Sequence, residues 1–166
     1  MTLYLLRHSL ALPLGARGIA TDEERFLSDE GRALGARTAR GIQALGLEFD
    51  QILTSPLVRA RQTAEIVAKI LGAQERLKHC DVLRPGMKPK RLLDWTAEEK
   101  KARHVLCVGH QPDLGAFISY AVWKIKQGRF SFSECSLAGI ELGEETNKLR
   151  LLLTGERLAQ LGERRR

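Results

Sequence analysis

Short, continuously apolar segments alternate with amphipathic segments along this chain. Residues 2–9 (TLYLLRHS), 49–55 (FDQILTS) and 104–110 (HVLCVGH) are predicted to be strands, because short apolar runs of this length are typical of strands covered on both faces. Between the first two, Leu34, Thr38, Ile42 and Leu45 recur at the spacing of one helix face. The pattern therefore predicts strands and helices in alternation.

Capping residues predict where two of the helices begin and end. Ser28 is a candidate N-cap followed by two acidic residues, and Gly46 is a plausible stop for that helix. Ser55 and Pro56 predict the next helix start, with a capping hydroxyl and a proline at the first helical position. That helix is expected to end at Gly72.

The other segments complete an α/β pattern. They comprise a loop (12–27), an irregular region (73–90), a short helix (92–102), a longer helix (112–126), a hairpin (136–142 and 148–154) and a short helix with a frayed tail (156–166). Strands alternating with helices predict one α/β domain over residues 1–166: a three-layer sandwich whose mainly parallel sheet has helices on both faces. A basic tail is expected at about 160–166.

Composition narrows the class of protein. The chain has 166 residues, of which 43% are hydrophobic and 28% charged, enough apolar material for a sizeable core. Its apolar runs are far shorter than the roughly 20 residues of a transmembrane helix, so no membrane association is expected. A signal peptide carries its positive charge before the apolar stretch, whereas Arg7 follows it here, so we expect a cytoplasmic protein.

The spacing of the cysteines and the net charge of the chain narrow the cofactors and partners to be expected. Cys80, Cys107 and Cys135 are widely separated and form no CxxC pair, so we expect reduced, partly buried thiols and neither disulfides nor zinc. The net charge of +7 favours anionic substrates or partners. Aromatic residues are 5% of the chain and do not interleave with basic ones, so no specific nucleic-acid partner is expected.

Two of the predicted strands end in a histidine, His8 and His110. The carboxyl ends of parallel strands meet at one edge of a sheet, where ligands bind in open α/β folds. Residues 49–55 deliver a helix start to the same edge, with Arg59 near its first turn, and a helix N-terminus attracts anions. A lone histidine at a strand end is more often structural, but two at equivalent ends indicate a site.

The chemistry of this set points to phosphoryl transfer. Arg7 and Arg59 can clamp phosphate oxygens through paired hydrogen bonds. One neutral imidazole can attack phosphorus while the other donates to the transferring group, so catalysis would rest on positioning and charge stabilisation. No metal or other cofactor is required if the two guanidinium groups neutralise the phosphoryl oxygens.

The segments LRHS, SPLVRARQT and VGH resemble the three signature segments of the histidine phosphatase superfamily, the phosphoglycerate-mutase-like group. The compact length and RFLSDEG at 25–31 are similar to SixA-type phosphohistidine phosphatases. The resemblance implies that His8 is the nucleophile that forms a phosphohistidine intermediate, that Arg7 and Arg59 bind phosphate, and that His110 is the second histidine of the pocket. It also implies a basic residue near the site at Arg25.

Two positions depart from the superfamily pattern. Ser9 replaces the usual glycine, and its hydroxymethyl group could either narrow the pocket or hydrogen-bond phosphate as a substrate-binding residue. The stretch CDVLRPGMKPKRLLDW at 80–95 lacks the acidic residue that protonates the leaving group in many members, with Asp81 only a weak candidate. A leaving imidazole is easily protonated near neutral pH, whereas an alkoxide needs an acid, so the departure favours a phosphohistidine substrate.

The leading hypothesis is therefore a phosphohistidine phosphatase acting on a phosphorylated protein, for example a histidine phosphotransfer domain. The short segment between Gly72 and His104 leaves little chain to close over a small substrate, which suits a phosphorylated protein side chain. Two alternatives stay open: a phosphatase for a small phosphate ester, and a non-catalytic basic domain that binds phosphorylated or nucleic-acid partners.

Overall fold

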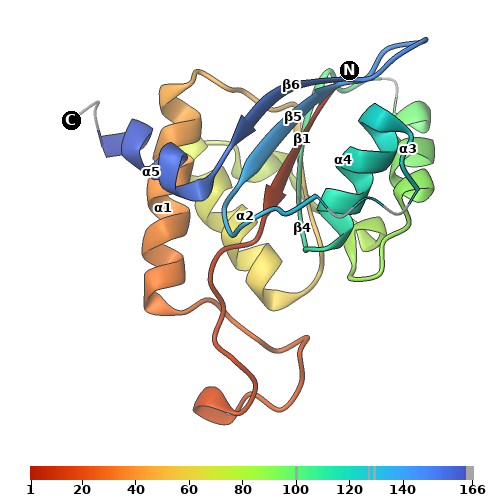
Figure 1. The fold of residues 1–166 in the computed structure, drawn as a ribbon. Coiled ribbons are helices and arrows are strands. Elements are labelled where there is room, and N and C mark those ends of the chain that lie inside the picture. The colour runs from red at the N-terminus through yellow and green to blue at the C-terminus, as the bar shows by residue number, and fades with distance from the viewer. Residues whose placement is uncertain (100, 127, 129, 164–166) are drawn as a thin grey trace.

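Six strands form the central sheet of the computed structural model, in the order β3-β2-β4-β1-β5-β6 (Figure 1). Their bounds are β1 Thr2–Arg7, β2 Gln51–Thr54, β3 Leu77–His79, β4 His104–Gly109, β5 Leu137–Glu141 and β6 Lys148–Leu153. The first four run parallel, while β5 pairs antiparallel with β1 and with β6. The structure describes all residues except 100, 127, 129 and 164–166.

Helices cover both faces of this sheet, as predicted. They are α1 Asp29–Ala44, α2 Val58–Leu71, α3 Pro89–Glu98, α4 Asp113–Trp123 and α5 Gly155–Glu163. Helices α1, α2 and α5 lie on one side of the sheet, and α3 and α4 lie on the other (Figure 1). The result is the predicted three-layer sandwich.

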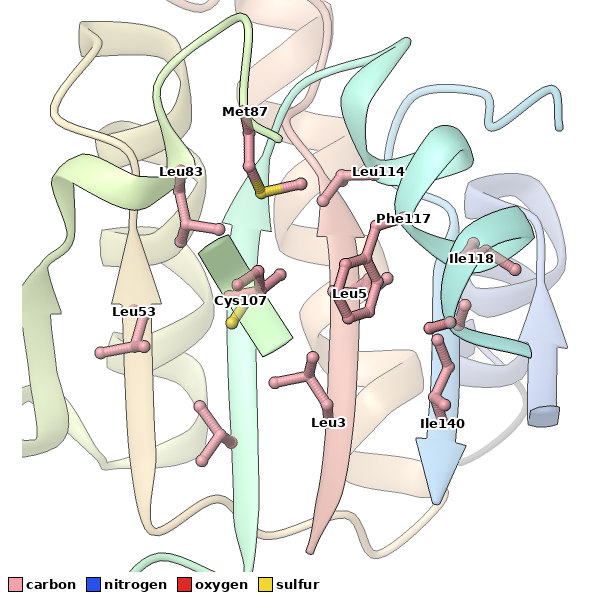
Figure 2. Packing of buried hydrophobic residues seen from close by; sticks show 14 of the residues in the cluster. Leu3, Leu5, Leu53, Leu83, Met87, Cys107, Leu114, Phe117, Ile118 and Ile140 are labelled. Atoms are coloured by element: carbon pink, nitrogen blue, oxygen red, sulfur yellow. The ribbon is translucent and has the colours of Figure 1, made fainter. Parts of the chain in front are cut away.

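Side chains alternate along β1 between two apolar cores. Leu3 and Leu5 face α4, where they pack in one cluster with Phe117 (Figure 2). Tyr4 and Leu6 face the opposite way and join the cluster beneath α1 and α2. Because residues of a strand point alternately to its two faces, a strand buried on both faces must be continuously apolar, as residues 3–6 are.

The capping predictions were confirmed for α1 but were wrong for the start of α2. The Ser28 hydroxyl accepts a hydrogen bond from the Gly31 amide, 3.0 Å away, at the start of α1. Helix α2 begins at Val58, so neither Ser55 nor Pro56 lies at its first turn, and its N-cap Leu57 makes no side-chain cap. The helix ends as predicted at Gly72, whose φ of 66° is left-handed.

Several boundaries also differ from the prediction. The region 73–90, predicted irregular, contains the edge strand β3, whose three residues are mostly exposed and leave little apolar signal. The helix predicted at 92–102 begins earlier, with Pro89 in its first turn, and ends at Glu98. Helix α4 ends at Trp123, three residues before the predicted end, and the hairpin of β5 and β6 was confirmed. The last residues of the predicted basic tail, 164–166, lie outside the described residues.

Helices α1 and α5 pack unusually closely. A Cβ added at Gly41 of α1 would overlap the Leu158 carbonyl group of α5, so only glycine permits this approach. By contrast, a Cβ at Gly35 of the same helix would make ordinary contacts of 3.6 Å or more with Ile66 and Ser9. Gly41 therefore fixes the spacing of the two helices, and Gly35 does not.

The three cysteines are buried and form no disulfide. Burial raises the pKa of the Cys80, Cys107 and Cys135 thiols, so all three stay protonated at neutral pH and are poor nucleophiles. None of the helices in the described part of the chain is long and apolar enough to cross a bilayer.

Candidate active site

The two histidines predicted from the strand ends lie side by side. Strands β1 and β4 are parallel neighbours whose register pairs Arg7 with Gly109, so the next residue of each strand reaches the same edge. The His8 amide donates to the Gly109 carbonyl at 3.0 Å, which extends the ladder by one step. The ring centroids of His8 and His110 are 5.2 Å apart. Both side chains are held by rigid strand ends.

Arg59 joins the histidines from the first turn of α2. Its side chain is 6% exposed, and its Nε lies 3.2 Å from Nε2 of His8. Arg61, two residues later, is half-exposed and pairs with Glu65 on another face of the helix, as expected from the helical spacing. The first amide of the helix, that of Val58, donates to the Glu23 carbonyl at 3.4 Å. The helix start is thus covered by the loop that precedes α1.

These side chains line a pocket of about 370 Å³. Its walls are Arg7, His8, Leu10, Ala11, Asp22, Arg25, Arg59, Pro85, His110, Gln111 and Glu134. Arg7, His8, Arg59 and His110 were predicted to meet, and the structure brings them together. Arg25, which the resemblance implied, also lines this pocket, and its Nε donates to the Leu12 carbonyl at 2.7 Å.

The hydrogen bonds of His8 identify its free nitrogen. Nδ1 lies 2.7 Å from the Ser9 carbonyl oxygen, which can only accept, so Nδ1 carries the hydrogen. Nε2 therefore has a lone pair, and it accepts from Arg59. Burial, with the positive charges of Arg59 and Arg7, lowers the pKa of His8 to about 4 against the opposing effects of the Ser9 carbonyl and Glu134. His8 is thus neutral at pH 7, and its Nε2 lone pair can act as a nucleophile once Arg59 gives up this hydrogen bond.

His110 presents the opposite nitrogen. Its Nε2 lies 2.8 Å from the Ser55 hydroxyl oxygen, which already accepts from the Leu57 amide. Among the described residues, His110 Nε2 is the one acceptor within reach of the Ser55 hydroxyl hydrogen, so we assign that hydrogen to the bond with Nε2 and the imidazole hydrogen to Nδ1, a buried atom that has no partner among those residues. Burial, followed by the charges of His8 and Arg59, lowers the pKa of His110 to about 3, so this ring is also neutral at pH 7.

The two terminal nitrogens of the Arg7 guanidinium group have partners, whereas its Nε has none among the described residues. Its Nη1 donates to the Phe132 carbonyl at 2.9 Å, and Nη2 forms an ion pair with Glu134. Its Nε is buried and has no partner in the described part of the chain. Arg7 Nε and His110 Nδ1 are therefore two buried, unpartnered donors on side chains that line the same pocket, and buried polar groups of this kind call for a partner such as a ligand or water.

Asp22 holds the second arginine. Arg59 donates through Nη1 to the Asp22 carbonyl at 2.6 Å and through Nη2 to its carboxylate at 2.8 Å. Arg25 donates to the other carboxylate oxygen at 3.0 Å. Burial raises the pKa of Asp22, but the hydrogen bonds from Arg25 and Arg59 outweigh it and hold the pKa below its ordinary value.

The role expected for Ser9 differs from the structure, whereas the interpretation of Asp81 as a surface residue agrees with it. The Ser9 side chain is fully buried, and its hydroxyl donates to the Gly31 carbonyl at 2.7 Å. It is therefore committed to α1, does not line the pocket, and neither narrows it nor is placed to bind phosphate. Asp81, the weak candidate for a general acid, is exposed, binds Arg84 at 2.9 Å and is also absent from the pocket walls.

Asp22, Gln111 and Glu134 also line the pocket and were not predicted from the sequence. Gln111 directly follows His110, and its amide donates to the Phe130 carbonyl at 2.8 Å. Glu134 lies just before β5, and because β5 runs antiparallel to β1, it begins at the edge where β1 ends. A strand order placing β5 beside β1 would have pointed to Glu134. For Asp22, in an irregular loop, no sequence signal was available.

The arrangement is suited to an oxyanion. Two guanidinium groups, a neutral imidazole with a lone pair on Nε2 and a second imidazole with an unpartnered N–H share the pocket with Arg25, Gln111 and the carboxylates of Asp22 and Glu134. Among the described residues, no cluster of three or more potential metal ligands of the His, Cys, Asp or Glu type occurs. Positive charge in this pocket comes from arginine side chains.

Comparison with known proteins identifies a family and a shared fold. Residues 3–84 match the family described as the Histidine phosphatase superfamily (branch 1). An uncharacterized protein from Picosynechococcus sp. is 34% identical over 149 residues, covering 86% of each chain. The protein histidine phosphatase SixA, solved with tungstate, superposes with a TM-score of 0.79 at 23% identity over 95% of this chain and 99% of that one.

A second solved structure shares the fold but carries a different substrate in its name. The alpha-ribazole phosphatase from Shigella flexneri superposes with a TM-score of 0.71 at 16% identity, over 93% of this chain and 97% of that one. The fold is thus common to phosphatases named for protein and small-molecule substrates. On the family match and the shared phosphoglycerate-mutase-like architecture, this chain belongs to the histidine phosphatase superfamily.

Proposed function

We propose that this phosphatase removes the phosphoryl group from a phosphohistidine of another protein. The observation that carries the proposal is that one pocket is lined by His8, whose Nε2 has a lone pair, and by Arg7 and His110, each of which has a buried donor without a partner among the described residues. A phosphoryl group offers one electrophilic atom and several acceptor oxygens, which is the complement of this set.

In the first step, His8 Nε2 attacks phosphorus and the bond to the leaving nitrogen breaks. His8 is neutral at pH 7, so its lone pair is available without prior loss of a proton. The Ser9 carbonyl holds the Nδ1 hydrogen and stabilises the positive charge that the ring gains as the new bond forms. A phosphohistidine enzyme intermediate results.

The phosphoryl oxygens are neutralised by side chains alone. Arg7 and Arg59 approach from β1 and α2, and the N–H of His110 adds a third donor from β4. Donors fixed in advance on strand ends and a helix need little reorganisation when charge moves onto the oxygens, which is the main source of rate in such sites. This arrangement requires no cofactor.

The substrate class follows from the region where many members of the superfamily have an acid. Pro85 lines the pocket there, and Asp81 is turned outward onto Arg84. An imidazole leaving group takes up its proton readily near neutral pH, whereas an alkoxide needs a positioned acid. This region thus supplies no acid to the pocket, which supports a phosphohistidine substrate over a phosphate ester.

The partner is a phosphorylated protein rather than a metabolite. The segment between α2 and β4 forms only short elements, namely β3 and the ten-residue α3. It adds no separate domain over the pocket, so a histidine on another protein, such as a histidine phosphotransfer domain, can approach it. We place this reaction in the cytoplasm.

The test is phosphate release from a histidine-phosphorylated protein without added metal, comparing the parent with His8→Ala. We expect clear release by the parent and none above background by the variant. Full activity in His8→Ala would disprove the proposed nucleophile. Turnover of one small phosphate ester, with none of phosphohistidine, would instead assign the protein to the small-molecule phosphatases. Nucleic-acid binding without any phosphatase activity would support the non-catalytic alternative.

A further inference from the structure

Glu134 places a carboxylate inside a pocket built for an anion. Its side chain is 33% exposed and forms an ion pair with Arg7 through one oxygen. Its other oxygen has no hydrogen-bond donor within the part of the chain described by the structure. A negative charge here repels a phosphoryl group, and it lies in the same pocket as the nucleophile, with one carboxylate oxygen left unused by the ion pair.

The backbone around Glu134 fixes its position relative to the nucleophile. Cys135 has a φ of 56°, a left-handed conformation that few residues other than glycine adopt. Its amide donates to the Arg7 carbonyl at 3.1 Å, and the Arg7 amide donates to the Ser136 carbonyl at 3.2 Å. The turn before β5 is thus tied to the strand end that carries His8. The Glu134 charge also raises the pKa of His8 against the larger effect of burial, which places the two groups within electrostatic reach.

The other carboxylate of the pocket is not equivalent. Both carboxylate oxygens of Asp22 accept hydrogen bonds from arginines, one from Arg59 and one from Arg25. It sits on the loop before α1, whereas Glu134 sits on a turn bonded to β1. Of the two, Glu134 has the oxygen that is free to take a proton.

We propose that Glu134 is the general base that activates water to hydrolyse the phosphohistidine intermediate on His8. The inference rests on the proposed function. When a phosphoryl group enters and takes the donors of Arg7, the Glu134 carboxylate loses its ion-pair partner and becomes available to a water molecule.

Hydrolysis returns His8 to its neutral form. A water oxygen forms a bond to phosphorus while the bond from phosphorus to His8 Nε2 breaks, and that bond's electron pair returns to Nε2 as a lone pair. The proton of the water passes to the Glu134 carboxylate. Inorganic phosphate leaves, His8 is again neutral, and Glu134 later releases its proton to solvent.

The experiment measures the phosphoenzyme during turnover of phosphoramidate, the simplest compound with a P–N bond. The full-length parent and Glu134→Gln are mixed with phosphoramidate, quenched in alkali and analysed by intact mass for one added phosphoryl group. We expect kcat to fall about 100-fold or more in Glu134→Gln, as on loss of a general base, while the phosphorylated fraction rises. Formate should restore hydrolysis to Glu134→Ala, because a small carboxylate can replace the missing one.

Asp22→Asn is the matched control, since it also removes a carboxylate from an arginine of the pocket. We expect it to change KM without accumulation of phosphoenzyme. The inference is overturned if Glu134→Gln turns over as fast as the parent, or if formation and hydrolysis of the phosphoenzyme slow equally, which would reduce Glu134 to a positioning partner of Arg7. Absence of phosphoenzyme and activity in the parent itself would instead overturn the proposed function.

Discussion

Arg59 donates its Nε hydrogen to Nε2 of His8, across 3.2 Å, so the lone pair proposed to attack phosphorus is occupied in the free pocket. The same guanidinium group binds Asp22 through its two other nitrogens. Arg59 therefore sets the direction of the lone pair and lowers the pKa of His8, although burial is the larger cause. A bound phosphoryl group must take over these donors as it reaches His8.

Replacing Arg59 by glutamine tests this double role. We expect Arg59→Gln to lower kcat/KM by about 100-fold to 1,000-fold, as on loss of one oxyanion donor. The positive charge is also lost, so the pKa of His8 rises and the acid limb of the kcat/KM profile moves to higher pH. Arg61→Gln, on an exposed face of the same helix, should leave both quantities unchanged. A shift of the acid limb in both variants would contradict the assignment.

Ser55 is expected to act through His110 rather than as a helix cap. In Ser55→Ala, Nε2 of His110 loses its donor at 2.8 Å, so the hydrogen is no longer confined to Nδ1. We expect kcat/KM to fall about tenfold, the equivalent of one buried hydrogen bond. The imidazole nitrogen chemical shifts of His110 should show the change of tautomer, and Ser55→Thr should restore them. Unchanged shifts in Ser55→Ala would refute the role.

The lowered pKa values of the histidines make stability depend on pH. His8 has a pKa of about 4 in the folded chain and 6.5 as the ordinary value, so the unfolded chain binds more protons between these limits. Stability is therefore lost as pH falls from about 6.5 to about 4, by roughly 3 kcal/mol for this group. His8→Gln should lose less stability over this window, as measured by urea unfolding, than the parent or the exposed-site control His79→Gln. Equal losses in all three would contradict the shift.

The buried Ser9 hydroxyl predicts an effect on folding rather than on substrate. Ser9→Ala removes its hydrogen bond to the Gly31 carbonyl at the start of α1, so we expect the free energy of unfolding to drop by about 1 kcal/mol. KM for the phosphorylated substrate should not change, because the side chain does not line the pocket. A raised KM with unaltered stability would restore the role in substrate binding expected from the sequence.

The glycines of α1 give a matched pair. Gly41→Ala forces α1 away from the Leu158 carbonyl, and we expect a loss of about 1–3 kcal/mol in the free energy of unfolding. Gly35→Ala meets only ordinary contacts and should stabilise the protein by up to about 1 kcal/mol through helix propensity. Thermal unfolding of both variants decides the matter. Effects of the same sign would mean that the helix spacing is not set at Gly41.

The sequence predicted those site residues that directly follow the end of a single strand or lie in the helix after it. His8 and His110 follow apolar runs, and parallel pairing of such strands is enough to bring them to one edge. Arg59 was predictable because a helix start follows β2. These relationships are local in sequence, and the strand and helix patterns carry them.

The remaining parts depend on which elements become neighbours. Glu134 reaches the pocket only because β5 pairs with β1, a choice of strand order that the apolar pattern of β5 does not contain. The direction of the Ser9 side chain depends on the close approach of α1, and the partner of the Ser55 hydroxyl depends on the pairing of β2 with β4. Tertiary contacts override the local expectation in each case.

The ion pairs of Arg7 with Glu134 and of Arg59 with Asp22 give the pocket its own internal competitors for anions. When a phosphoryl group binds, each arginine exchanges a carboxylate partner for a phosphoryl oxygen. The guanidinium groups are already paired, so binding does not have to remove water from unpaired charges. After hydrolysis the two carboxylates form their ion pairs with the arginines again, and this favours the release of inorganic phosphate. We therefore expect inorganic phosphate, the product of the proposed reaction, to be only a weak inhibitor.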